Sequence, residues 1–150
     1  MSRLATLLAF FAWPATRQIA AFEHLPRDRG APDFYTGLNR NPLLTLVDAL
    51  CDEACHGDNE PELDFLARTA LPKDTSRTAF PELLCYADLL RRSLCAEDYW
   101  TQRALRDKTA WTLFRRLAAQ SLSDLRWNGD CSIDEVRQLV GHYQKKFAQP

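Results

Sequence analysis

The chain has 150 residues, of which 46% are hydrophobic, and its 19 basic and 20 acidic residues leave a formal net charge of −1. This length and apolar content suffice for one well-filled core, so we expect a single domain over residues 1–150. The balanced charge excludes a bulk electrostatic attraction to nucleic acid, and only a local basic patch would bind phosphates. Leu, Ala and Arg dominate over Val, Ile and Thr, which favours helices.

The first apolar segment, LATLLAFFAW, follows Ser2 and Arg3 and ends before Pro14. A short basic start followed by an apolar run also resembles a signal peptide. No small-x-small cleavage motif follows it, however, and a run of about ten residues is too short to span a bilayer. We therefore predict a buried core helix capped by Ser2, in a cytoplasmic protein that does not bind a membrane.

Capping signals divide the rest of the chain into further helices. Asn41 followed by Pro is a typical helix start, Gly57 is a typical stop, and Ser132 with Glu135 forms a capping box. The predicted helices cover residues 2–13, 15–24, 42–56, 59–70, 78–94, a long stretch at 93–127, and 132–147. The pattern predicts an all-α fold, a compact single-domain bundle of six to eight helices around a central helical stretch at about 96–127.

The central stretch, Ser93–Trp127, contains no Gly or Pro, and its large apolar residues fall on one broad helical face. Asp107 interrupts that face. Either the helix breaks and Asp107 caps a second helix that begins near Lys108, or a buried carboxylate pairs with Arg103 or Arg106. We favour the cap, because Asp is a strong N-cap residue. The residues Asn128-Gly129 would then end this stretch in a left-handed conformation.

The chain has five cysteines, Cys51, Cys55, Cys85, Cys95 and Cys131. Their odd number and scattered spacing are not typical of a disulfide framework, so we expect reduced thiols. Only Cys51-x-x-x-Cys55-His56 has a spacing typical of metal ligands, and it supplies at most three of the four ligands that zinc requires. We therefore expect Cys51 and Cys55 to pack as small apolar residues, and we predict no metal and no cofactor.

The sequence contains no assembled catalytic motif. A nucleophile elbow, a P-loop and a dinucleotide fingerprint are all absent. None of the three histidines, His24, His56 and His142, is placed beside a nucleophile by the sequence pattern. Pairs of carboxylates such as Asp52-Glu53 are interpreted as ordinary surface pairs. We therefore predict that the protein is not an enzyme.

A basic stripe lies opposite the apolar face of the central stretch. Lys108, Arg115 and Arg126 fall in line on the helical wheel. A solvated helix face is the simplest interpretation, and a surface for phosphates or an acidic partner is the functional one. Aromatic and Arg side chains are also those that protein interfaces favour. The candidate binding surface therefore comprises Arg91, Arg92, Lys108, Arg115, Arg116, Arg126 and Trp127.

These observations predict a non-catalytic protein that binds another macromolecule. The first hypothesis is a protein–protein interaction module, which would be an accessory subunit, adaptor or small inhibitor of a larger assembly. The alternative is a helical subunit of a nucleoprotein complex that holds the nucleic-acid backbone on the basic stripe. The sequence pattern does not identify the partner.

Overall fold

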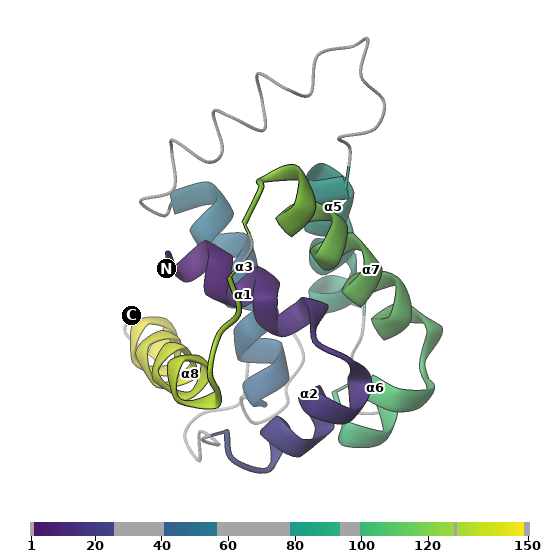
Figure 1. Cartoon of the computed structure of the whole chain (residues 1–150). Coiled ribbons are helices and arrows are strands. Elements are labelled where there is room, and N and C mark those ends of the chain that lie inside the picture. The colour runs from purple at the N-terminus through teal and green to yellow at the C-terminus, as the bar shows by residue number, and fades with distance from the viewer. Residues whose placement is uncertain (1, 26–40, 57–78, 94–99, 128, 149–150) are drawn as a thin grey trace, which may run out of the picture.

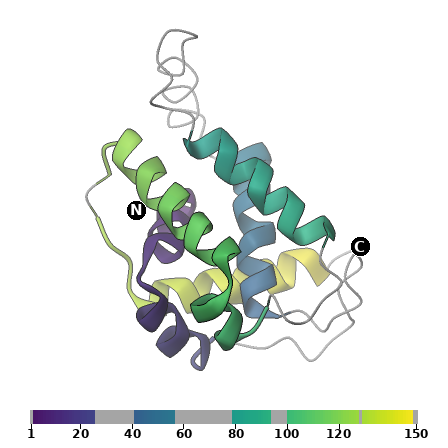
Figure 2. The ribbon, with the colours of Figure 1, turned by 90° about the vertical axis from the view of Figure 1, so that its right-hand side faces the viewer.

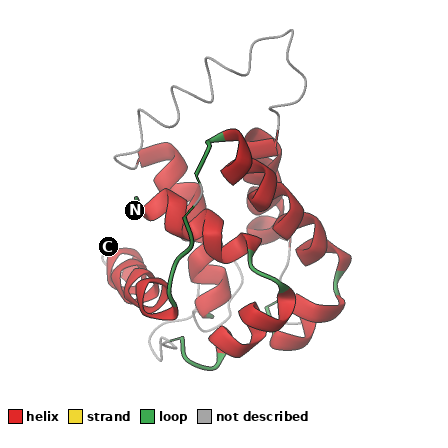
Figure 3. Cartoon of the chain, viewed as in Figure 1, coloured by secondary structure: helices red, strands yellow, loops and turns green. Residues whose placement is uncertain are grey.

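The computed structural model describes residues 2–25, 41–56, 79–93, 100–127 and 129–148. Within these ranges the chain forms seven helices and no strand (Figures 1 and 3). The helices are α1 (Arg3–Ala12), α2 (Ala15–Phe22), α3 (Pro42–His56), α5 (Ala79–Ser93), α6 (Gln102–Asp107), α7 (Thr109–Asp124) and α8 (Ile133–Ala148). They pack together as an all-α bundle, which confirms the predicted fold class. The helix predicted over residues 59–70 lies outside the described ranges.

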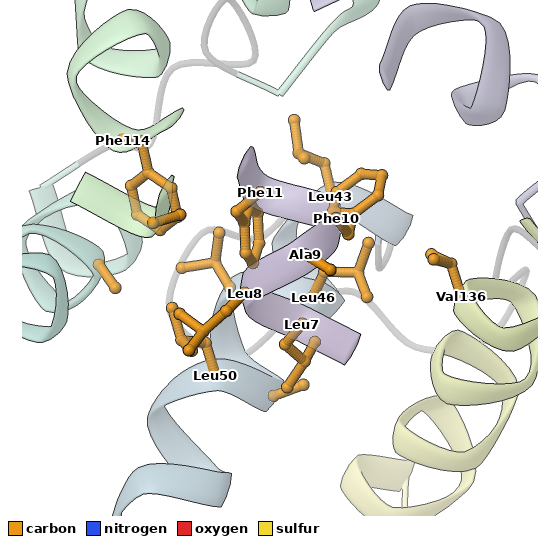
Figure 4. Packing of buried hydrophobic residues seen from close by; sticks show 14 of the residues in the cluster. Leu7, Leu8, Ala9, Phe10, Phe11, Leu43, Leu46, Leu50, Phe114 and Val136 are labelled. Carbon is orange, nitrogen blue, oxygen red and sulfur yellow. The ribbon is translucent and has the colours of Figure 1, made fainter. Parts of the chain in front are cut away.

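Helix α1 is the most deeply buried helix of the described bundle. Every residue from Leu4 to Phe11 is buried, as expected for a helix that is apolar on all sides. Its side chains lie among Leu46 of α3, Phe114 of α7 and Val136 of α8 (Figure 4). The bundle is therefore built around α1, whereas the sequence pattern had placed the 96–127 stretch at its centre. None of the described helices is both long enough and apolar enough to cross a membrane.

Polar side chains define both ends of α1. The Ser2 hydroxyl accepts a hydrogen bond from the Ala5 amide at 3.1 Å, which confirms the predicted N-cap. After Pro14 the chain turns into α2, and the amide of the buried Gln18 donates to the carbonyls of Phe10 and Phe11 at 3.0 and 3.2 Å. Gln18 therefore satisfies carbonyl groups that the end of a helix would otherwise leave without a partner.

The predicted break near residue 107 is present, but its capping residue is different. Helix α6 ends at Asp107 and α7 begins at Thr109, with the extended residue Lys108 in the N-cap position and no side-chain cap. Asp107 is exposed and pairs with Arg103 at 3.4 Å and Arg106 at 3.0 Å. The prediction that Asp107 caps α7 is wrong. The alternative pairing with both arginines occurs, but on the surface, because Asp107 is the last residue of α6 and points to solvent.

The end of α7 is a Schellman motif built on Arg126. The Trp127 amide donates to the Leu122 carbonyl and the Arg126 amide donates to the Ser123 carbonyl, both at 3.0 Å. Arg126 has a φ of 57°, in the left-handed region that favours glycine. The expectation that Asn128-Gly129 would supply this conformation is wrong, because α7 ends at Asp124, earlier than expected.

Helices α5 and α8 complete the described part of the bundle. Helix α5 packs against α3 and α7, and α8 packs against α3 and α1 (Figure 2). The Ser132–Glu135 capping box at the start of α8 is formed, with hydrogen bonds of 3.0 and 3.2 Å. Trp13, Trp100 and Trp111 are buried, so these tryptophans fill the core.

Candidate functional site

The arginines at the end of α5 are bound by neighbouring carboxylates. Arg91 donates to Asp88 at 3.0 Å and lies 3.7 Å from Asp48 of α3, and Arg92 contacts the same Asp88 oxygen at 3.0 Å. This network ties α5 to α3. It also offsets part of the positive charge that the sequence analysis assigned to the candidate binding surface.

Arg115 is directed into the protein. Its Nη1 donates to Oε1 of Gln18 at 2.9 Å and to the carbonyl of Leu105 at 2.8 Å. The guanidinium is half-buried, and burial lowers the pKa of Arg115. Together with the bonds of Gln18 to the end of α1, these contacts join α1, α2, α6 and α7. Arg115 is therefore a structural link between helices: its Nη1 is directed into the protein, while its Nη2 donates to the hydroxyl of the exposed Thr112 on the same helix at 3.3 Å.

The other candidate residues are spread along α7. Lys108 and Arg126 flank a helix of 16 residues, which corresponds to about 24 Å. Arg116 and Arg126 are exposed, and within the described part of the chain neither forms an ion pair. Trp127 is half-buried and packs against the core. The structure thus brings Arg91 and Arg92 together and does not gather the seven candidates into one patch.

An exposed apolar ridge runs along α5. Leu89 is 60% exposed and is the only large hydrophobic residue that is exposed in the described ranges. Pro81 and Cys85 are also exposed and precede it at intervals of four residues, so the three side chains share one helix face. Arg92 is exposed and extends this face at the end of the helix. We call Pro81, Cys85, Leu89 and Arg92 the α5 ridge.

A buried carboxylate lies between α1, α3 and α8. Glu53 is only 3% exposed, and its carboxylate accepts a hydrogen bond from the hydroxyl of the buried Tyr143. Nη1 of Arg3 lies 3.8 Å from the same carboxylate. Burial, and then the neighbouring Glu53, raise the pKa of Tyr143 far above its usual range. The interpretation of Asp52-Glu53 as a surface pair is wrong for Glu53, because that position of α3 faces the core.

Charged groups surround this buried pair. Lys146 contacts Asp52 at 2.5 Å, which adds a second polar link between α8 and α3. Burial, and then the positive charges of Arg3 and Lys146, lower the pKa of the exposed His142. A phenol with a raised pKa stays protonated at neutral pH and keeps its hydroxyl as a hydrogen-bond donor. The cluster therefore fastens α8 to the bundle.

Of the cysteines that the structure describes, Cys51 and Cys131 are buried and Cys85 is exposed. Cys51 is buried in the core, as predicted, while the side chains of Cys55 and His56 lie outside the described part. Burial raises the pKa of Cys131 to about 12, so its thiol stays protonated at neutral pH. Among the described residues, no group of three or more His, Cys, Asp or Glu side chains could hold a metal ion.

No protein-family model, curated protein or solved structure matches this chain. Its function is therefore inferred from its own surface. Leu89 was not among the predicted surface residues, because it does not belong to the apolar stripe of α5. That property is also the signal that could have identified it, since a leucine on the polar side of an amphipathic helix is exposed when the helix packs.

Proposed function

We propose that this chain is a non-catalytic protein–protein interaction module of the cytoplasm, acting as an accessory subunit or adaptor through the α5 ridge. The observation that carries this proposal is the 60% exposure of Leu89 beside the exposed Pro81 and Cys85. Covering a leucine side chain fully contributes about 1.5–3 kcal/mol. Arg92 supports the proposal because arginine is enriched at protein interfaces.

The spacing of the α5 ridge suits a helical partner. Side chains at intervals of four residues form a row that fits into the groove between rows on a second helix. An amphipathic helix that docks in this way presents anchors at spacings of three, four and seven residues. The ridge offers positions 81, 85, 89 and 92, which follow that spacing. A helix of a partner protein is therefore the expected ligand.

A second candidate function uses the outward face of α7. Arg116 and Arg126 are exposed there, together with the hydroxyl-bearing residues Thr112 and Ser123. Such side chains commonly contact the phosphates of nucleic acids. The observation that favours this function is the left-handed backbone of Arg126, because backbone strain at a position that favours glycine is often retained for a functional side chain.

A pull-down of the tagged chain from its native host, with and without nuclease, tests both candidates. Leu89→Glu alters the α5 ridge and Arg116→Glu alters the face of α7. Both residues are exposed, so the two variants should fold and can serve as controls for each other. We expect a stoichiometric protein partner that survives nuclease, is lost with Leu89→Glu and is retained with Arg116→Glu.

Other outcomes contradict the proposal. Recovery that depends on nucleic acid and on Arg116 would establish the second candidate instead. A partner that Leu89→Glu still recovers would exclude the α5 ridge as the docking surface. If neither the wild type nor the variants recover a partner, both candidates are contradicted.

A further inference from the structure

We propose that the α5 ridge docks onto the α5 ridge of a second copy of this chain, in an antiparallel arrangement with two-fold symmetry. This inference rests on the proposed function, because it assigns a partner to the same surface. A two-fold interface uses one patch twice, so the patch must be complementary to itself. The sequence of the exposed face of α5 meets this requirement.

The complementarity follows from the positions of four exposed residues. Ala87 lies midway between Cys85 and Leu89, and also midway between Glu82 and Arg92. When two α5 helices run antiparallel and cross at the level of residue 87, whose own side chain is buried on the opposite side of the helix, Leu89 of each copy faces Cys85 of the other. The same geometry places Glu82 of each copy opposite Arg92 of the other. One apolar contact and one ion pair are thus each formed twice.

The charges select this orientation over a parallel one. Glu82 is in the first turn of α5 and Arg92 is in the last turn. A parallel pair would place like charges opposite each other at both ends, which is unfavourable. The Arg92 side chain is 67% exposed, and its Nε contacts Asp88 at 3.0 Å, so an intrahelical contact already orients it.

Helices α7 and α8 do not combine these features. Helix α8 also has an acidic first turn and a basic last turn, but its exposed middle positions, Gln138 and His142, are polar. The outward face of α7 presents Arg116 and Arg126, which would repel the same residues of a second copy in a parallel pair. The apolar area of the α5 ridge is small, so we expect a weak association that depends on concentration.

Sedimentation equilibrium of the full chain over a range of concentrations tests this inference. We expect a monomer–dimer equilibrium in the wild type and a monomer for Leu89→Glu. The single variants Glu82→Arg and Arg92→Glu should each weaken association about tenfold, because each creates two pairs of like charges. The double variant carrying both changes restores the opposite charges and should associate about as well as the wild type.

The design separates the interface from local effects. Arg92→Glu also removes the contact with Asp88, but the double variant lacks that contact as well, so loss of that contact cannot explain a difference in association between the two variants. Arg116→Glu, on another helix, should leave the equilibrium unchanged.

Failure of this inference is distinguishable from failure of the proposed function. A wild-type chain that is monomeric at every concentration overturns the inference. So does a Leu89→Glu variant that dimerises as well as the wild type, or a double variant that stays monomeric. The proposed function would still stand if the pull-down recovered a different protein through Leu89. If the wild-type chain stays monomeric and the pull-down recovers no protein through Leu89, the inference and the proposed function are both overturned.

Discussion

Trp13 and Asp130, at the end of α1 and shortly before α8, are joined by a 2.8 Å hydrogen bond from the indole Nε1 to Oδ1. Arg17 completes the contact: it donates to Oδ2 of Asp130 at 2.7 Å, and its guanidinium carbon lies 3.7 Å from the centre of the Trp13 ring. A single carboxylate thus ties the segment before α8 to both α1 and α2.

Removal of the Asp130 carboxylate should destabilise the fold. Asp130→Ala leaves the buried Trp13 indole without an acceptor, which costs about 1–3 kcal/mol in the free energy of unfolding. Asp130→Asn keeps an oxygen acceptor and should cost less. Urea denaturation of the three proteins at pH 7 measures the difference, and equal stabilities of Asp130→Ala and the wild type would contradict this role.

The same carboxylate predicts a pH dependence. The hydrogen bonds from Arg17, and then from Trp13, hold the pKa of Asp130 below its usual value. Its contribution is therefore present above about pH 4 and is lost as the pH falls through the lower pKa of the folded state. The effect is small, because the side chain is 60% exposed and solvent screens it. Asp130→Asn should lack this part of the acid transition.

Substitution of Arg126 by glycine should stabilise the protein. The φ of 57° costs any residue with a Cβ atom about 1 kcal/mol relative to glycine, so Arg126→Gly should raise the free energy of unfolding by about 0.5–1 kcal/mol. Arg116→Gly is the matched control. It places glycine inside α7 and should lower stability by about 1 kcal/mol. Thermal denaturation of the two variants and the wild type measures these changes in stability. Destabilisation by Arg126→Gly would contradict a left-handed backbone at residue 126.

Tyr143 predicts a loss of stability at alkaline pH. Its pKa is higher in the folded state than in the unfolded chain, so its contribution is present below about pH 10 and is lost as the pH rises above that value. Tyr143→Phe should remove this dependence. It should also cost about 1–3 kcal/mol at neutral pH, since the Glu53 carboxylate loses a donor. Denaturation measured between pH 7 and about pH 11 tests both effects.

Glu53→Gln provides the control for this alkaline transition. The amide oxygen can still accept the hydrogen bond from Tyr143, but the negative charge that helps to raise the pKa of Tyr143 is gone. We expect a weaker pH dependence than in the wild type. An alkaline transition that Tyr143→Phe leaves intact would assign it to another group.

The same change should destabilise the protein much more at Arg115 than at the neighbouring Arg116. Arg115→Ala removes the hydrogen bonds to Gln18 and Leu105 and should cost about 1–3 kcal/mol. Arg116→Ala, at an exposed position, should change stability by no more than about 0.5 kcal/mol. Equal effects of the two changes in chemical denaturation would contradict the inward orientation of Arg115.

Local signals predicted the helices well because helix ends depend on neighbouring residues. Ser2 and the Ser132–Glu135 box cap helices as expected. Such a cap is a hydrogen bond between a side chain and an amide three residues apart, and it does not depend on tertiary packing. Asp107 shows the limit of such signals. Its residue type was right for a cap, but α7 begins one residue later than that cap would require.

Tertiary contacts explain what the sequence did not predict. The burial of Glu53 depends on Tyr143, and the direction of Arg115 depends on Gln18, both distant in the chain. Helical spacing shows which residues share a face but not which face another helix covers. For that reason the basic stripe was predicted as one surface, and the exposed Leu89 was not identified.

The enclosed position of α1 has a consequence for synthesis of the protein. Its main contacts are with α7, α3 and α8, two of which are made only after most of the chain has been translated. Until then the apolar surface of α1 is exposed on the ribosome, where it is a target for chaperones and for aggregation. Because the pairing of α1 with α7 and α8 joins segments distant in sequence, closure of the loops between them should slow folding compared with a bundle of sequential neighbours.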